Sequence, residues 1–159
     1  MDNAFGNEPL IPLLDYVQWL ERAIHEIPSH DESESLIKNN FSSDARLQID
    51  KQTLDRGGFL KFTLDYREKF TFLDYEFYQA ASTANDYKGQ SGTVGVGIKV
   101  RGQRKEDGKL FEAILHGIYQ IEWLPTGRSG AHRRQITKVT RVLQGPYPVS
   151  FTPSRSSVL

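Results

Sequence analysis

Apolar residues recur at helical spacing over residues 8–27, near the start of the chain. Leucine, valine and isoleucine fall three or four residues apart there, which places them on one face of a helix. Pro12 is compatible with the first turn of that helix, and Pro28 ends it. The pattern predicts an amphipathic helix, followed after a polar turn by a short second helix from about Ser33 to Asn40.

The next segments are short and change period twice. Ala45–Asp50 alternates weakly between apolar and polar residues, which predicts a short strand. Gly57 and Gly58 predict a break, and aromatic residues then return at helical spacing over Phe59–Phe70. We expect a third helix over this last range.

Long alternating runs fill most of the second half of the chain. They predict four strands: Thr71–Ser82, Gly92–Arg101, Leu110–Leu124 and His132–Leu143. The connections between these runs are short and rich in Gly, Asp, Asn or Pro, as hairpin turns are. Adjacent strands joined in this way form an antiparallel meander.

Helices that precede an antiparallel sheet indicate an α+β domain. We expect the sheet to curl around the N-terminal helices, as a cone-shaped α+β barrel with a pocket inside. One domain over residues 1–144 accounts for the pattern, because a chain of 159 residues suits a single domain with a substantial core. Residues 145–159 contain several Pro and Ser and are predicted to form a C-terminal tail.

The chain contains no cysteine, which excludes disulfides, thiolate nucleophiles and cysteine-ligated metal sites. The four histidines show no metal-binding spacing, and we expect neither a metal nor another cofactor. No apolar run reaches the length of a membrane span, and residues 1–6 lack the pattern of a secretory signal. We therefore expect a cytoplasmic protein without a membrane partner.

Charge is unevenly distributed along the chain, although the net charge is zero. Residues 1–79 contain 8 Lys or Arg and 15 Asp or Glu, whereas residues 80–159 contain 12 and 5. Opposite fields on a helical side and a sheet side would favour self-association. The alternative is a basic nucleic-acid surface built from Arg101, Arg104, Lys105, Arg128, Arg133, Arg134 and Lys138. No nucleic-acid motif accompanies these residues, so we do not expect such a partner.

Three stretches of the chain are similar to segments of one known family. They are Asn40–Ala45, an aromatic-polar-Asp-Ala entry into a strand, Tyr119–Trp123 at the end of a long strand, and Arg134–Val142 after a Gly-containing turn. In this order the chain resembles the nuclear transport factor 2-like superfamily over residues 8–144. That superfamily includes SnoaL-like polyketide cyclases, ketosteroid isomerase and scytalone dehydratase. The resemblance implies a curled cone fold, which hosts enzymes and binding modules alike.

The predicted strand Leu110–Trp123 supplies the main candidates for chemistry. Its side chains alternate between two faces, and the more apolar face carries Tyr119 and Trp123. Tyr119 then points into the pocket, at a position that resembles that of an oxyanion-hole acid in ketosteroid isomerase. The alternative is a core tyrosine bonded to the backbone. His116 falls on the other face, as a surface or interface residue, unless a β-bulge turns it inward as a general acid or base.

Two further residues are candidates on the neighbouring strands. Asp50 ends the first short strand, one residue away from where ketosteroid isomerase has its base, and the alternative is a solvated turn residue. Arg141 enters the pocket to hold an anionic oxygen if its face of the last strand points inward, whereas the opposite choice brings in Lys138. The three histidines other than His116 lie in polar or terminal contexts, and we expect them to be exposed.

Aromatic residues complete the predicted pocket. Tyr16 adjoins the apolar stripe of the first helix, and Trp19, Tyr75, Phe77 and Trp123 would form walls suited to a flat, hydrophobic substrate. We therefore expect a cofactor-independent enzyme, an isomerase, dehydratase or cyclase that moves protons on a polycyclic or aromatic, natural-product-like molecule. The alternative is a non-catalytic ligand-binding or dimerisation module of the same fold.

The outer face of the strand Leu110–Trp123 is too apolar for open solvent and too polar for a core. It carries Glu112, Ile114, His116, Ile118, Gln120 and Glu122. A mixed face of this kind is typical of a subunit interface, so we expect a homodimer.

Overall fold

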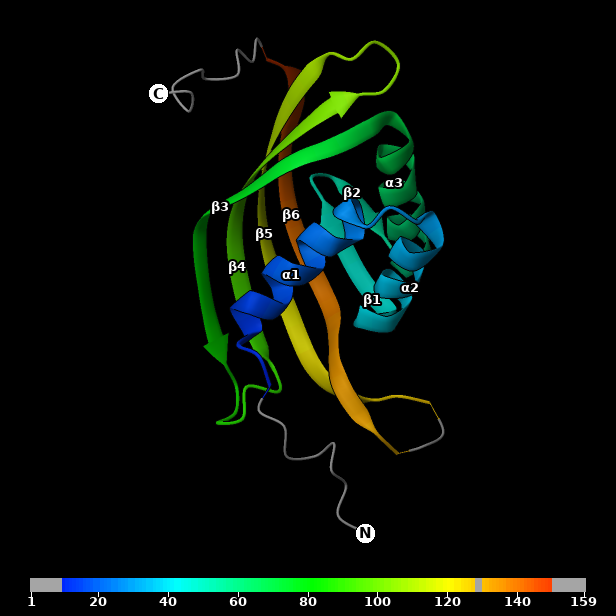
Figure 1. The fold of residues 1–159 in the computed structure, drawn as a ribbon. Coiled ribbons are helices and arrows are strands. Elements are labelled where there is room, and N and C mark those ends of the chain that lie inside the picture. The colour runs from blue at the N-terminus through cyan, green and yellow to red at the C-terminus, as the bar shows by residue number, and fades with distance from the viewer. Residues whose placement is uncertain (1–9, 128–129, 150–159) are drawn as a thin grey trace, which may run out of the picture.

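In the computed structural model, which describes residues 10–127 and 130–149, three helices pack against one six-stranded sheet (Figure 1). The helices are α1 (Leu13–Glu26), α2 (His30–Asn40) and α3 (Arg56–Lys69). The strands are β1 (Phe41–Ile49), β2 (Gln52–Leu54), β3 (Phe70–Ala84), β4 (Gly92–Arg104), β5 (Leu110–Pro125) and β6 (His132–Pro148). The α+β class predicted from the sequence is confirmed.

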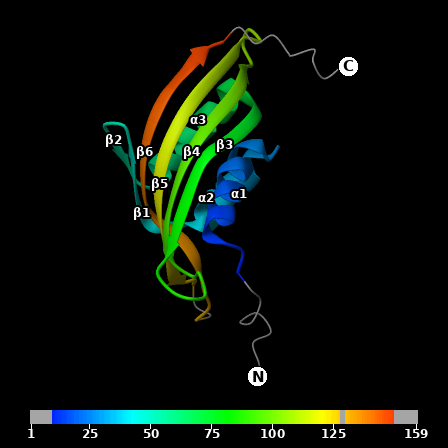
Figure 2. The same ribbon diagram turned by 90° about the vertical axis from the view of Figure 1, so that its left-hand side faces the viewer.

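The sheet is mixed, curled and not closed into a barrel. Its strand order is β2-β1-β6-β5-β4-β3, and β3 to β6 form the predicted antiparallel meander. β1, however, runs parallel to β6, so the expectation of a fully antiparallel sheet is wrong at this pair. The short strand β2, which the pattern did not predict, pairs with the outer edge of β1. Figure 2 shows the curl of the sheet, with the helices on its concave side.

The core lies between α1 and the concave face of the sheet. Val17, Leu20 and Ile24 of α1 are buried there, against buried side chains of β4 and β5 such as Ile98 and Ile121. Each fully buried aliphatic side chain of this kind contributes about 1.5–3 kcal/mol relative to exposure. The helical spacing read from the sequence therefore identifies the face of α1 that packs on the sheet.

Several element boundaries differ from the predicted ones. Asp55 caps α3 by accepting a 2.7 Å hydrogen bond from the Gly58 amide, so Gly57 and Gly58 belong to the first helical turn and not to a break. β1 begins at Phe41, directly after α2 and four residues before the predicted strand. β6 continues to Pro148, through the first residues of the predicted tail. The predicted tail from residue 150 onward lies outside the described residues.

Arg67 of α3 fixes the end of α1. Its buried guanidinium donates to the carbonyl oxygens of Ile24 at 2.7 Å, His25 at 3.1 Å and Ile27 at 2.5 Å, and to Nδ1 of His30 at 3.0 Å. The last carbonyl groups of a helix have no partners within the helix, and here a cation from another helix satisfies them. This clamp holds the C-terminal half of α1 in place against the sheet.

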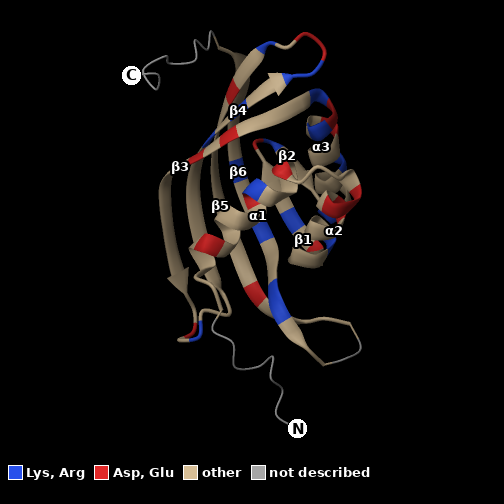
Figure 3. Cartoon of the chain, viewed as in Figure 1, with Lys and Arg blue, Asp and Glu red and all other residues tan. Residues whose placement is uncertain are grey.

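The basic residues considered as a nucleic-acid surface are mostly engaged within the chain. Arg134 is buried and donates to the carbonyl oxygen of Gly89, while Arg104 pairs with Asp107 in the β4–β5 loop. Arg101 contacts acidic side chains on both neighbouring strands. Figure 3 shows that positive and negative residues are interspersed in the β4–β5 loop rather than separated. Arg128 of the same set lies outside the described residues.

Candidate active site

Three charged and polar side chains meet in the core between α1 and the sheet. Glu21 of α1 accepts hydrogen bonds at the same oxygen, Oε1, from the Tyr119 hydroxyl of β5 and from the Arg141 guanidinium of β6. The exposed fractions are only 3% for Glu21, 4% for Arg141 and 0% for Tyr119. We call these three residues the Glu21 cluster. A buried carboxylate and guanidinium need each other, because either charge alone would lack compensation for its lost hydration.

The sheet makes room for the cluster through a glycine. Gly117 of β5 stands opposite Arg141 of β6 and two residues before Tyr119, on the same inner face. A Cβ atom at Gly117 would lie 2.9 Å from Cε2 of the Tyr119 ring, which is too close for an unstrained contact. The Arg141 guanidinium lies 5.4 Å from the centroid of the Tyr119 ring and 5.1 Å from that of Phe59, so two aromatic rings hold it.

His25 and two aromatic residues of β3 adjoin the cluster. The His25 ring packs against Phe72 at 4.6 Å and Tyr75 at 5.7 Å between ring centroids. Its Nδ1 lies 3.0 Å from the backbone carbonyl oxygen of Glu21. A carbonyl oxygen only accepts, so Nδ1 carries the hydrogen and the other ring nitrogen, Nε2, keeps its lone pair. His25 thus brings a second proton-accepting atom within one helical turn of Glu21.

Burial sets the protonation states around the cluster. It raises the pKa of Tyr119 and of Tyr75 well above the ordinary value, and the nearby Glu21 charge acts in the same direction, so both phenols are neutral donors. Burial lowers the pKa of His25, against a smaller opposing effect of Glu21. Burial is the largest single influence on Arg141 and opposes its charge, but the charge of Glu21 together with Tyr119 and Tyr75 raises the pKa of Arg141 above the ordinary value. A neutral imidazole and a charged guanidinium therefore flank the carboxylate at neutral pH.

Arg141 and α3 also carry polar atoms without partners. Nε of Arg141 and the hydroxyl oxygen of Thr63 are buried, and neither has a hydrogen-bond partner among the described residues. Thr63 lies one helical turn after Phe59, whose ring contacts Arg141. Buried polar atoms are nearly always satisfied, so the Nε–H of Arg141 is a donor position that an oxygen-bearing molecule or an ordered water can fill.

The two candidate bases of the sequence analysis lie away from the cluster. Asp50 is exposed in the turn after β1, where its φ is 54°, and Oδ1 accepts a 3.0 Å hydrogen bond from the Leu143 amide. His116 is exposed on the outer face of β5, and its Nε2 lies 2.6 Å from the Tyr78 hydroxyl. The register of β5 shifts only nearer its two ends, so no bulge turns His116 inward. A catalytic role for either residue stays a prediction without support from its position.

The predicted wall residues fall into separate places. Tyr75 adjoins the Glu21 cluster, whereas Tyr16 is buried nearer the start of α1, where its hydroxyl donates to Oδ1 of Asn40 at 2.9 Å. Trp123 is half-buried near the end of β5. Trp19 and Phe77 line a groove of about 400 Å³ between the outer face of α1 and β3. The predicted wall residues therefore do not line one common pocket.

Neither a protein family model nor a curated protein sequence matches the chain. Solved structures do match it. An NTF2-like protein from Rhodospirillum rubrum, described as of unknown function in nutrient uptake, is 12% identical with a TM-score of 0.60, over 82% of this chain and 97% of that one. A ketosteroid isomerase-like protein from Erwinia carotovora atroseptica is 14% identical with a TM-score of 0.59, over 88% of this chain and 99% of that one. The fold is NTF2-like.

A third similar structure is the hexachlorocyclohexane dehydrochlorinase LinA-type3 from Novosphingobium barchaimii. It is 13% identical with a TM-score of 0.59, over 86% of this chain and 92% of that one. At such identities the likeness concerns the fold alone. It confirms the resemblance to the nuclear transport factor 2-like superfamily at the level of architecture, and this chain's own residues must carry any argument about chemistry.

Within this NTF2-like fold, Glu21 and His25 are the two site residues that the sequence analysis missed. His25 was expected to be exposed, but it is half-buried, with its ring packed against Phe72 and Tyr75. A signal was present for Glu21, which lies four residues after Val17 and three before Ile24, inside the apolar face of the helix. His25 follows Glu21 by four residues and adjoins the same face. An acidic residue within an apolar helical stripe is the pattern that identifies this site.

The described residues 10–127 and 130–149 contain no group of three or more His, Asp or Glu placed to hold a metal ion. Among the described helices, none has both the length and the apolar character needed to cross a membrane.

Proposed function

We propose that the chain is a cofactor-independent isomerase or lyase that moves a proton on a small molecule, with the Glu21 cluster as its active site. The observation that carries this proposal is a buried carboxylate in which one oxygen accepts two hydrogen bonds and the other accepts none from the described residues. Oε1 of Glu21 accepts from both Tyr119 and Arg141, and Oε2 receives no hydrogen bond from the described residues. Perturbed ionisable groups that converge in this way are typical of active sites.

Each group has one role in this proposal. Oε2 of Glu21 takes a proton from a carbon of the substrate, while Tyr119 and Arg141 orient the carboxylate through Oε1. The unpartnered Nε–H of Arg141 donates to the substrate oxygen on which negative charge develops. Neutral His25 is half-buried, and it exchanges the proton between Glu21 and solvent through Nε2.

The surroundings of the cluster favour a flat, oxygen-bearing substrate. The rings of Phe59, Phe72 and Tyr75 lie around Arg141 and His25, and aromatic walls suit aromatic or polycyclic molecules. We propose that the substrate reaches the cluster past His25 and Phe72, because these two are the half-buried members of the group. Isomerisation, β-elimination of water and aldol-type cyclisation of a natural-product-like ketone each have a route that begins with removal of a proton from the carbon next to the carbonyl group.

Solvent exchange tests the proposal even though the natural substrate is not identified. Wild-type protein is incubated in D₂O with a panel of ketones that includes a β,γ-unsaturated ketosteroid, and mass spectrometry detects deuterium at the carbon next to the carbonyl. We expect Glu21→Gln and Tyr119→Phe to lower the exchange rate by about 10²-fold or more.

Matched controls decide between the candidate bases. Glu122→Gln removes an exposed carboxylate from the outer face of the strand that carries Tyr119, and we expect it to leave the rate unchanged. Asp50→Asn and His116→Gln test the two bases predicted from the sequence, and full activity in both variants is expected. A loss of exchange in either of them, with Glu21→Gln active, would overturn the assignment to Glu21.

A non-catalytic binding module is the second candidate function. It is favoured by the near-complete burial of Glu21, Tyr119 and Arg141, whose side chains are almost wholly covered by the described residues. If this candidate holds, wild-type protein gives no exchange with any panel member, and replacing Glu21 and Arg141 together by Leu and Met keeps ligand binding intact.

We also propose that two copies of the chain pair through the outer face of the sheet. Ile118 and Val142 are 55% and 54% exposed on the neighbouring strands β5 and β6, beside Tyr78 and His116. A second copy would present the same self-complementary patch, as cyclic dimers do. Sedimentation velocity at micromolar concentration tests this: a dimer is expected for the wild type and a monomer for Ile118→Glu. A wild-type monomer would remove the proposal.

A further inference from the structure

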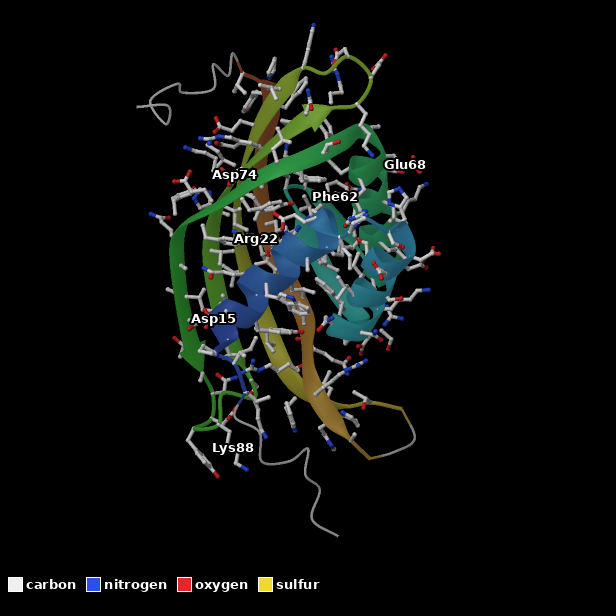
Figure 4. The ribbon with its side chains drawn as sticks, viewed as in Figure 1. Asp15, Arg22, Phe62, Glu68, Asp74 and Lys88 are labelled. Carbon is white, nitrogen blue, oxygen red and sulfur yellow. The ribbon has the colours of Figure 1, made fainter. Side chains whose placement is uncertain are left out.

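Three charged residues and a tryptophan form a stripe on the outer face of α1, and this stripe borders the groove between α1 and β3. Asp15, Trp19, Arg22 and Glu26 are spaced four, three and four residues apart, so they lie along one side of the helix. Phe77 of β3 lines the same groove, whose volume is about 400 Å³. This volume is in the range of small-molecule sites. Figure 4 labels Asp15 and Arg22 along α1.

The groove is separate from the Glu21 cluster. At about 100° per residue, this stripe lies on the side of α1 opposite to Val17 and Ile24, which face the core. Trp19 is 48% exposed, whereas Glu21 is buried. A molecule in the groove therefore does not meet the groups proposed for proton transfer.

The charged side chains of the groove differ in how many protein groups they contact. The Arg22 guanidinium donates to the Tyr75 carbonyl oxygen at 3.1 Å, lies 3.8 Å from Glu26 and packs 5.7 Å from the centroid of the Phe77 ring. Asp15, by contrast, has no hydrogen-bond or ion-pair partner among the residues that the structure describes. Its exposed carboxylate and the half-exposed ring of Trp19, one helical turn away, form the end of the groove that protein groups leave accessible.

We infer that this groove binds a small organic cation with an apolar body, such as a protonated arylalkylamine. The positive group lies between the Asp15 carboxylate and the Trp19 ring, because both attract a cation and an indole face is the strongest aromatic partner for one. The apolar body lies along Trp19 toward Phe77. An anionic ligand is disfavoured, because Asp15 and Glu26 repel it and Arg22 is already occupied by protein groups.

Titration with phenethylamine, followed by NMR, tests this inference. The chain has two tryptophans, so two indole N–H signals are expected, and Trp123→Phe assigns the remaining one to Trp19. Phenethylamine is expected to shift the Trp19 signal saturably and to leave that of Trp123 in place. 3-Phenylpropanoate, an anion of similar size, and 2-phenylethanol, a neutral analogue, are expected to give no saturable shift.

Substitutions at the two ends of the site complete the test. Asp15→Asn is expected to weaken phenethylamine binding about two- to fivefold, as the loss of one exposed charge contact does, and Asp15→Lys to weaken it more. Trp19→Leu, read out by isothermal titration calorimetry, is expected to weaken binding about two- to fivefold. Asp15 and Trp19 both lie on the exposed side of the helix, so these variants retain the fold, and Glu122→Gln serves as a charge control outside the groove.

Two results would overturn the inference. One is equal binding of the amine and the propanoate, and the other is unchanged amine affinity in Asp15→Lys. The outcome is independent of the proposed catalysis, because Tyr119→Phe is expected to lower proton exchange by about 10²-fold or more while it leaves phenethylamine binding unchanged.

Discussion

Removal of the negative charge from the Glu21 cluster has a large predicted cost. In Glu21→Gln, the buried Arg141 keeps its charge, which the two flanking rings and a neutral amide compensate only in part. Loss of one partner of a buried ion pair typically lowers the free energy of unfolding by about 3–5 kcal/mol. For a chain of this size each kcal/mol lowers the melting temperature by about 2–4 °C, so a decrease of roughly 6–20 °C is expected.

The matched double variant separates the charge effect from packing. Replacing Glu21 by Leu and Arg141 by Met removes both charges, and such exchanges are often neutral or stabilising by about 1–4 kcal/mol. Urea unfolding of the wild type, Glu21→Leu, Arg141→Met and the double variant, followed by circular dichroism, gives the coupling energy. A cost of less than about 1 kcal/mol for Glu21→Gln, or a double variant less stable than either single variant, would contradict a buried ion pair whose two charges depend on each other.

Three further predictions concern single positions. The pKa of His25 is lowered from 6.5 in the folded protein, so the unfolded chain binds the proton more readily. The free energy of unfolding should therefore decrease as the pH falls below 6.5. NMR titration should show His25 neutral at pH values where exposed histidines are charged. Gly92→Ala would place Cβ 2.2 Å from the backbone oxygen of Thr83, and a loss of about 1–3 kcal/mol is expected in urea unfolding. Arg67→Met leaves the carbonyl groups of His25 and Ile27 without this donor, while that of Ile24 keeps the Ser33 hydroxyl. We expect a loss of at least about 2 kcal/mol, with faster hydrogen exchange of the α1 amides. A variant as stable as the wild type would contradict either estimate, and a charged His25 at pH 6.5 would contradict the first.

Local pattern predicted most of the elements. The apolar stripe of α1 identifies the face of that helix that is buried. The alternation in β4 to β6 does the same for the strands, and these buried faces together form the core. The same alternation correctly assigned Tyr119 to the inside and His116 to the outside. Arg141, one of two alternatives for the inward cation of β6, is buried, whereas Lys138 is exposed.

Errors arose where one local rule competed with a longer-range interaction. Gly57 and Gly58 suggested a break, but the Asp55 cap and packing of α3 on β1 outweigh the cost of two glycines in a first turn. In β3 the register shifts between Phe72 and Asp74, so Phe72 and Tyr75 both turn toward His25 although they are three residues apart. Strict alternation cannot reveal an extra residue in a strand.

Periodicity within single segments was enough to predict the class of the fold, the order of most of its elements and the inner face of β5. Which polar residues meet depends instead on the packing of distant segments. Glu21, Tyr119 and Arg141 are up to 120 positions apart, and they contact one another because α1 crosses the concave side of the curled sheet where β5 pairs with β6. The same crossing places Trp19 and Phe77 on the other side of the helix. A pattern reports whether a side chain is buried, but its partner is set by how the chain folds back on itself.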